Sequence, residues 1–132
     1  METPMLAVML ALSLQAATPP GPLAAPLAGD WVVDLSATPS EPYYKGMSLT
    51  LEADGRVTGS FYDSEILAGR WKTAGGRTCA SFRTTDGAGP YHTSVCQGAS
   101  GLEGQTWAEH RNFVFLWRAK PATAEDRKAK WW

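Results

Sequence analysis

Long hydrophobic runs are missing from this sequence. The longest apolar segment, from Met5 to Leu14, has ten residues. A helix of that length rises about 15 Å, half of the ~30 Å hydrocarbon core of a bilayer. A short apolar run near a start Met, followed by the small residues Ala16 and Ala17, is typical of a signal peptide. We therefore expect a signal peptide over residues 1–17, an extracytoplasmic (periplasmic or secreted) protein and no stable membrane insertion. Since no Lys or Arg precedes the run, an apolar N-terminus on a cytosolic protein is the alternative.

An excess of charge of either sign is also missing. Lys and Arg together number 12 and Asp and Glu 13, so the formal net charge is −1. Proteins that bind nucleic acid through a basic surface carry a clear positive excess, so we expect no nucleic-acid partner. The sequence has two His and two Cys, and neither His has two carboxylates beside it on a strand face. We therefore expect no metal site and no cofactor.

The third feature that the sequence lacks is a set of residues placed for catalysis. His92 and Ser94 fall on one face of a predicted strand, near Arg83 and Asp86. Residues two apart on a strand are separated by about 7 Å, which is too far for the hydrogen bond of a Ser–His pair. The glycines fall in predicted turns and at inward strand positions, so they form no phosphate-binding loop. We therefore expect no catalytic residues and a protein that is not an enzyme.

Two segments flank the part of the chain that we expect to form the domain, residues 29–119. Residues 18–28 contain four prolines and no charge, which favours an extended conformation and excludes a regular helix. This segment is either a linker or an arm that inserts into a partner protein. Residues 120–132 form a tail that ends in Trp131 and Trp132, and we expect it to be frayed or loosely packed unless it docks on a partner.

Between these segments, apolar and polar residues alternate with period two and glycine-containing turns follow at short intervals. Met47, Leu49 and Leu51 are separated by polar or hydroxyl side chains, and Asp54-Gly55 directly after them is a strong hairpin signal. Eight such strands follow one another in residues 29–119. We expect Ser64 at the centre of the turn after the third strand, so that Val57 faces Trp71 and Leu67 is buried. The pattern predicts an all-β fold, an antiparallel up-and-down eight-stranded barrel, because closure removes the exposed strand edges.

The two cysteines fall on neighbouring predicted strands. If Asp86 to Gly89 forms the connecting loop, Cys79 faces Cys96 directly. Directly opposed residues have Cβ atoms about 4.5–5.5 Å apart, close enough for a bridge after slight adjustment. We therefore predict a structural disulfide between Cys79 and Cys96, as suits a secreted chain of this size.

Aromatic side chains dominate the predicted inner face of the barrel, whereas Trp107 faces outward and is a candidate contact surface for a protein partner. An eight-stranded barrel is just wide enough to be filled by side chains or to hold one small ligand. Glycines at inward positions (Gly59, Gly69 and Gly104) leave room either for a ligand or for the tryptophans. The candidate residues for binding a small apolar or aromatic ligand are Trp31, Phe61, Trp71, Phe82, Tyr91, Phe115 and Trp117.

The order of short motifs resembles the avidin-like and lipocalin-like meander barrels. The motifs are Gly29-Asp30-Trp31, Ala53 to Phe61 (ADGRVTGSF), Leu67 to Trp71 (LAGRW), Gly104-Gln105 and Phe115-Leu116-Trp117. The resemblance implies the barrel fold over about residues 27–119. It does not imply biotin binding, because four polar or aromatic biotin contacts of the avidin-like family are replaced. The replacing residues are Val33, Phe61, Asp63 and Leu102, whereas Trp117 keeps the matching aromatic.

A second resemblance is to small periplasmic protease inhibitors, which combine an eight-stranded barrel, one disulfide and an extended N-terminal arm. Leu27 to Trp31 (LAGDW) and the proline-rich segment 18–28 carry it. Two functions follow as expectations. The first is a non-catalytic extracytoplasmic barrel that binds a small apolar or aromatic ligand. The second is a protein-binding module, such as a protease inhibitor, that acts through the arm.

Overall fold

The computed structural model describes residues 26–132. The predicted signal peptide, residues 1–17, and the first part of the proline-rich segment, residues 18–25, lie outside the described residues. No helix of the described part of the chain is long and apolar enough to cross a membrane.

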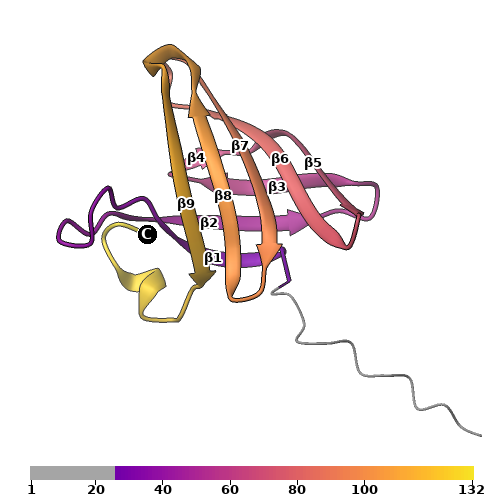
Figure 1. Ribbon diagram of the computed structural model, residues 1–132, viewed down its shortest axis with the longest axis horizontal. Coiled ribbons are helices and arrows are strands. Elements are labelled where there is room, and N and C mark those ends of the chain that lie inside the picture. Colours follow the sequence, from indigo (N-terminus) through magenta and orange to yellow (C-terminus); the bar gives the residue numbers. More distant parts are fainter. Residues whose placement is uncertain (1–25) are drawn as a thin grey trace, which may run out of the picture.

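The strands follow one another in a meander and close into a barrel (Figure 1). Their order is β2-β1-β9-β8-β7-β6-β5-β3-β4, and the additional pairing of β2 with β3 closes the ring. The short β4 and the longer β5 both pair with β3 and count as one strand of the barrel wall, so the barrel has eight strands. The predicted all-β antiparallel up-and-down barrel is therefore confirmed. The elements are β1 (Gly29–Asp34), β2 (Tyr44–Leu51), β3 (Arg56–Phe61), β4 (Ser64–Glu65), β5 (Leu67–Ala74), β6 (Arg77–Thr85), β7 (Pro90–Gly98), β8 (Gly101–Ala108), η1 (Glu109–Arg111), β9 (Phe113–Pro121) and η2 (Asp126–Lys128).

The two ends of the barrel differ in how they are filled. At the end where β1 begins, which we call the packed end, Leu27 is 1% exposed and its carbonyl accepts a hydrogen bond from the Trp31 indole at 3.0 Å. The core behind it includes Val33, Met47 and Leu102, all fully buried. The opposite end, which we call the mouth, is formed by the loop 35–43 and by the turns at 62–63, 86–89 and 109–112. The mouth holds the candidate site.

The hairpin between β3 and β5 differs from its sequence-based prediction. We expected Ser64 at the centre of the turn and Val57 opposite Trp71. Instead Tyr62 and Asp63 form a two-residue turn with φ of 54° and 62°, and Val57 pairs with Gly69. Hairpin turns that need positive φ at both central residues usually carry Gly, Asn or Asp there. This turn has Asp63 at its second position but a tyrosine, Tyr62, at its first.

The register shift also changes which side chain of this strand enters the core. Ile66 is 5% exposed and belongs to the core, whereas Leu67, which we expected to be buried, is only half-buried. Ala68 has a φ of 53° in the irregular stretch between Leu67 and Arg70. This irregularity brings β5 back into a regular pairing with β6.

The disulfide prediction is confirmed. Cys79 on β6 pairs with Cys96 on β7 in the predicted register, and their sulfur atoms are joined. The loop that the bridge closes spans the β6–β7 hairpin, with a sequence separation of 17. The turn at its tip, residues 86–89, lies at the mouth.

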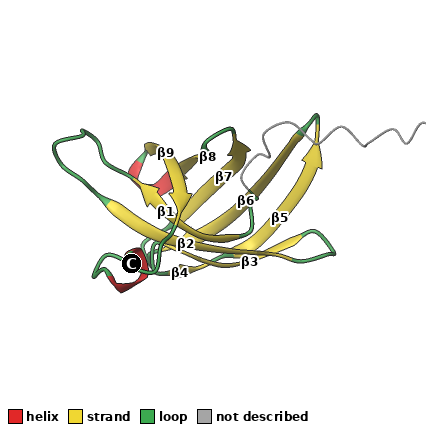
Figure 2. Cartoon of the chain, turned by 90° about the horizontal axis from the view of Figure 1, so that it is seen from below, coloured by secondary structure: helices red, strands yellow, loops and turns green. Residues whose placement is uncertain are grey.

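The C-terminal tail contacts the barrel instead of fraying, although none of residues 120–132 is fully buried, so of the two expectations a loosely packed tail agrees with the structure. Figure 2 shows it beside the outer side of the sheet, near β2. Arg127 forms an ion pair with Asp30 at 2.9 Å, and the Trp132 indole lies on Gly46 of β2. A Cβ at Gly46 would meet this ring at 2.8 Å, so the glycine leaves the space that the ring fills. Val32, which pairs with Gly46, is only 2% exposed on this outer face.

Candidate ligand-binding site

A cavity of about 530 Å³ opens at the mouth of the barrel. It is mainly apolar, and aromatic rings from four different segments of the chain converge on it. The edge of Tyr43 meets the ring of Tyr62 with centroids 6.0 Å apart, so the loop 35–43 and the β3–β4 turn form one side together. The lining residues are Leu35, Tyr43, Phe61, Tyr62, Asp63, Ser64, Thr84, Thr85, Asp86, Tyr91, Thr106, Arg111 and Phe115.

Of the seven aromatic residues that the sequence suggested for ligand binding, three line the mouth cavity and four do not. Phe61, Tyr91 and Phe115 line the mouth cavity. The other four lie elsewhere, because the strands place them deeper in the barrel or at its packed end. Trp31, Phe82 and Trp117 are buried in the core, and Trp71 borders a shallow hollow near the packed end, where its indole donates to the Glu52 carbonyl.

The inward glycines do not contribute space to the cavity. A Cβ at Gly104 would overlap the Trp117 indole, so this glycine makes room for the tryptophan. Cβ atoms at Gly59 and Gly69 would overlap the backbone of Ser48 and Val57, so these two allow close contact between strands. Room for a tryptophan is therefore the explanation for Gly104, whereas neither of the two explanations holds for Gly59 and Gly69.

Hydroxyl groups form the polar part of the cavity floor. The hydroxyl of Thr106 accepts a hydrogen bond from the Trp117 indole at 3.0 Å, and it lies 2.9 Å from the hydroxyl of Thr93. Thr84 is 5% exposed and also lines the cavity. The floor thus combines the Phe61 ring with threonine hydroxyls, and Trp117 lies directly beneath it.

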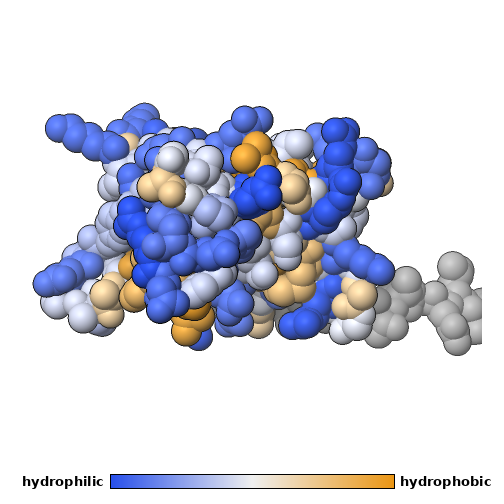
Figure 3. Space-filling view, turned by 90° about the horizontal axis from the view of Figure 1, so that it is seen from above, coloured by the Kyte–Doolittle hydropathy of each residue, from blue (hydrophilic) through white to orange (hydrophobic). Residues whose placement is uncertain are grey.

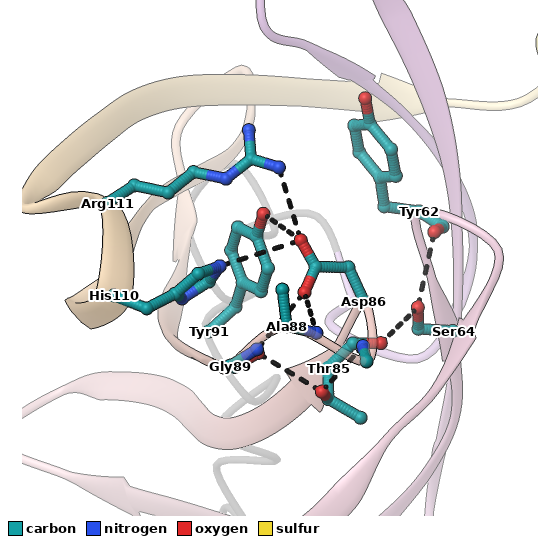
Figure 4. A network of polar contacts seen from close by, with 10 residues as sticks. Tyr62, Ser64, Thr85, Asp86, Ala88, Gly89, Tyr91, His110 and Arg111 are labelled. Carbon is teal, nitrogen blue, oxygen red and sulfur yellow. Dashed lines mark hydrogen bonds and ion pairs between the residues drawn. The ribbon is translucent and has the colours of Figure 1, made fainter.

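Asp86 is the centre of a polar network on one side of the mouth (Figure 4). One carboxylate oxygen accepts hydrogen bonds from the backbone N–H groups of Ala88 and Gly89 at 2.9 and 3.3 Å. The other accepts from the Tyr91 hydroxyl at 2.7 Å and from Arg111 at 3.2 Å, and the His110 imidazole lies 3.6 Å away. The network fixes the turn 86–89 against the turn that carries η1.

These contacts set the ionisation of two groups at the mouth. The hydrogen bond from Tyr91, followed by that from the Ala88 backbone, holds the pKa of Asp86 well below its ordinary value of 3.8. Burial, with the Asp86 carboxylate as the next cause, raises the pKa of Tyr91 above 10.0. Asp86 is therefore an anion and Tyr91 a neutral hydrogen-bond donor at neutral pH.

The residues of η1 attach this turn to the rest of the mouth. Glu109 lies 3.2 Å from the His92 imidazole on the outer face of β7. The His110 ring packs edge-on against Tyr91, with centroids 5.1 Å apart, and Gly89 leaves the space for it, because a Cβ there would meet the ring at 2.5 Å. Arg111 points to the cavity and to Asp86.

The sequence-based reasoning missed Tyr43, Tyr62 and Asp86 as cavity residues. All three lie in loops or turns, where the alternation that distinguishes inward from outward positions has ended. The useful signal was the concentration of tyrosines just outside the strands, since Tyr is a common residue where an apolar surface meets water.

Hydrophilic side chains cover most of the face drawn in Figure 3, and hydrophobic ones show in small separate areas. On the outer side of β9, Leu116 is 76% exposed and Val114 is 46% exposed. Trp107, which pairs with Val114, is half-buried. Within residues 26–132, no group of three His, Cys, Asp or Glu side chains is placed to hold a metal ion.

Comparison of the chain with protein-family models, with curated protein sequences and with solved structures finds no match. The closed antiparallel barrel is compatible with an avidin-like or lipocalin-like fold. The resemblance therefore concerns the architecture, and the function has to be argued from the mouth cavity itself.

Proposed function

We propose that this protein is an extracytoplasmic, non-catalytic β-barrel that binds a small apolar or aromatic molecule in the mouth cavity. The observation that carries the proposal is the convergence of aromatic rings from separate segments on one cavity, above a floor of threonine hydroxyls. Pockets for small molecules are typically about 300–1,000 Å³, mostly apolar, with a few placed polar groups. A cavity of about 530 Å³ falls within this range.

The proposed location is supported by two features. The sequence begins with a segment typical of a signal peptide, and the chain has a disulfide between Cys79 and Cys96. Structural disulfides persist mainly in oxidising compartments such as the periplasm or the extracellular space.

The experiment is a titration of the purified protein with N-phenyl-1-naphthylamine, an uncharged aromatic probe that fluoresces in apolar sites. The informative variants are Phe115→Ala and Leu116→Ala, which change neighbouring residues of β9. Phe115 lines the cavity, whereas Leu116 is on the outer face. Because an aromatic contact contributes roughly 0.5–1.5 kcal/mol beyond area burial, Phe115→Ala should weaken probe binding by about two- to thirteenfold, and Leu116→Ala should not change it.

Two further readouts make the test decisive. Trp117 lies beneath the cavity floor and is bonded to Thr106, so binding in the mouth should change its emission. Circular dichroism confirms that each variant is folded. Absence of saturable binding by the wild-type protein, or equal effects of Phe115→Ala and Leu116→Ala, would contradict the proposal.

A protein-binding module is the second candidate, through Trp107 or the proline-rich segment. The exposed Val114 and Leu116 beside Trp107 favour a contact on the outer face of β8 and β9. Leu27 is buried beneath the barrel, so an inhibitory arm could use only residues before it. Removing residues 18–25 should then abolish inhibition of a protease while the fold persists, and unchanged inhibition would rule out the arm.

A further inference from the structure

The two carboxylates that line the cavity, Asp86 and Asp63, both have partners within the chain. Both carboxylate oxygens of Asp86 accept hydrogen bonds, two from backbone N–H groups and two from the Tyr91 and Arg111 side chains. Asp63, in the neighbouring β3–β4 turn, is bonded to the Lys45 ammonium at 3.3 Å. Lys45 in turn lies 4.7 Å above the centre of the Tyr62 ring. Each of these carboxylates therefore already has a basic side chain beside it.

The Arg111 guanidinium, in contrast, has donors to spare. It lines the cavity, its side chain is 59% exposed, and within residues 26–132 it makes one side-chain hydrogen bond, from Nη2 to Asp86. A guanidinium has five N–H donors in a fixed fork that matches the two oxygens of a carboxylate or sulfonate.

The position of Arg111 relative to the aromatic rings sets the shape of a suitable ligand. Its guanidinium lies 5.9 Å from the centre of the Tyr91 ring, at the rim, while Phe61 and Phe115 line the cavity with the hydroxyl of Thr106. A molecule that fills the cavity with its apolar body thus brings one end to Arg111. An anionic group at that end remains close to water, so its desolvation cost is small.

We propose that the ligand of the mouth cavity is an amphipathic organic anion. Its aromatic or aliphatic body lies among the rings, and its carboxylate or sulfonate group binds the N–H donors of Arg111. This inference rests on the proposed function, since it requires that the cavity binds a small molecule. It adds the charge of the ligand and the residue that recognises it.

Two probes with the same ring system separate this inference from the proposed function. 8-Anilino-1-naphthalenesulfonate carries one sulfonate, and N-phenyl-1-naphthylamine is the same molecule without it. Both are titrated into the wild-type protein and into Arg111→Gln, with Arg118→Gln as the matched control. Arg118 is also an arginine of the β8–β9 hairpin, but it points outward, is 83% exposed and lies 3.9 Å from Glu103.

We expect Arg111→Gln to weaken binding of the sulfonate probe by about fivefold, the upper value for an exposed ion pair. Binding of the uncharged probe should change less than twofold, and Arg118→Gln should affect neither probe. Because the attraction is between exposed charges, raising the salt concentration should lower affinity for the sulfonate probe only. Arg111→Lys, which keeps the charge but not the fork, should fall between wild type and Arg111→Gln.

The outcomes are distinguishable. If Arg111→Gln leaves sulfonate binding unchanged, or weakens both probes equally in a folded protein, the inference is wrong while the cavity still binds apolar molecules. If the uncharged probe does not bind the wild-type protein, or if Phe115→Ala does not weaken its binding, the proposed function itself fails.

Discussion

Replacing Gly104 by Ala tests whether the Trp117 indole is locked in the barrel interior. Gly104 on β8 pairs with Trp117 on β9, and a Cβ at Gly104 would overlap two carbons of the six-membered ring and lie 2.7 Å from Cε2. Trp117 is 4% exposed, and its indole N–H donates to the hydroxyl of Thr106. The ring cannot move away without pressing on Phe61, whose centroid is 5.6 Å from it.

The expected cost follows from the lack of space. Adding a methyl group to a packed core typically costs about 1–3 kcal/mol, and a displaced indole also weakens its hydrogen bond to Thr106, worth about 1 kcal/mol. We therefore expect Gly104→Ala to lower the free energy of unfolding by about 2–3 kcal/mol. Urea unfolding followed by far-ultraviolet circular dichroism measures this change, and a shift of the Trp117 emission reports the displaced ring.

Gly46→Ala is the matched control, because Gly46 also abuts a tryptophan. A Cβ there would meet the Trp132 ring at 2.8 Å, but Trp132 is only half-buried on the outer face, so its side chain can swing away. Its cost should be below about 1 kcal/mol, since Gly→Ala also reduces the entropy of the unfolded chain. A Gly104→Ala protein as stable as wild type, or a larger loss for Gly46→Ala, would refute the reasoning.

Three other perturbations test separate parts of the molecule. Replacing Cys79 and Cys96 by Ser should lower the free energy of urea unfolding by about 3 kcal/mol, as expected for a loop of this length; an unchanged midpoint would mean that the bridge adds nothing. Asp86→Asn should lower the melting temperature at pH 7, where the depressed pKa of Asp86 favours folding. That difference should shrink as the pH falls below about 4, because the unfolded state then binds the proton while the folded carboxylate, with its depressed pKa, stays ionised; a difference independent of pH would argue against the charge. Trp132→Ala should speed amide hydrogen exchange around Val32, which lies cross-strand from the glycine under the ring, and equal exchange rates would show that the tail protects nothing.

The pairing of β6 with β7 was predictable because residues close together in the sequence determine it. The sequence Asp86 to Gly89 has the composition of a turn, and the alternation on either side fixes the register once the turn is placed. The bridge between Cys79 and Cys96 then follows from counting residues. Similar reasoning failed at the β3–β4 turn, because Tyr62 adopts positive φ at a turn position that usually carries Gly, Asn or Asp.

The candidate site was only partly predictable for a different reason. Phe61, Tyr91 and Phe115 were identified because inward-facing and outward-facing side chains alternate along each strand. An inward residue surrounds a cavity or fills the core according to its position along the barrel axis. The alternation of side chains does not give that position. The C-terminal tail shows the same limit, since the fit of Trp132 on Gly46 joins segments far apart in the sequence.

The distribution of side-chain size along the barrel axis explains why the cavity lies where it does. An eight-stranded barrel has an interior that side chains just fill, and Leu27, Trp31 and Trp117 use that space at the packed end and in the middle. Above them the inward positions include Thr84 and Thr106, whose side chains are too small to meet across the barrel. The mouth cavity therefore lies near the rim, so a ligand held there keeps one end in water. That geometry suits a molecule with an apolar body and a charged end.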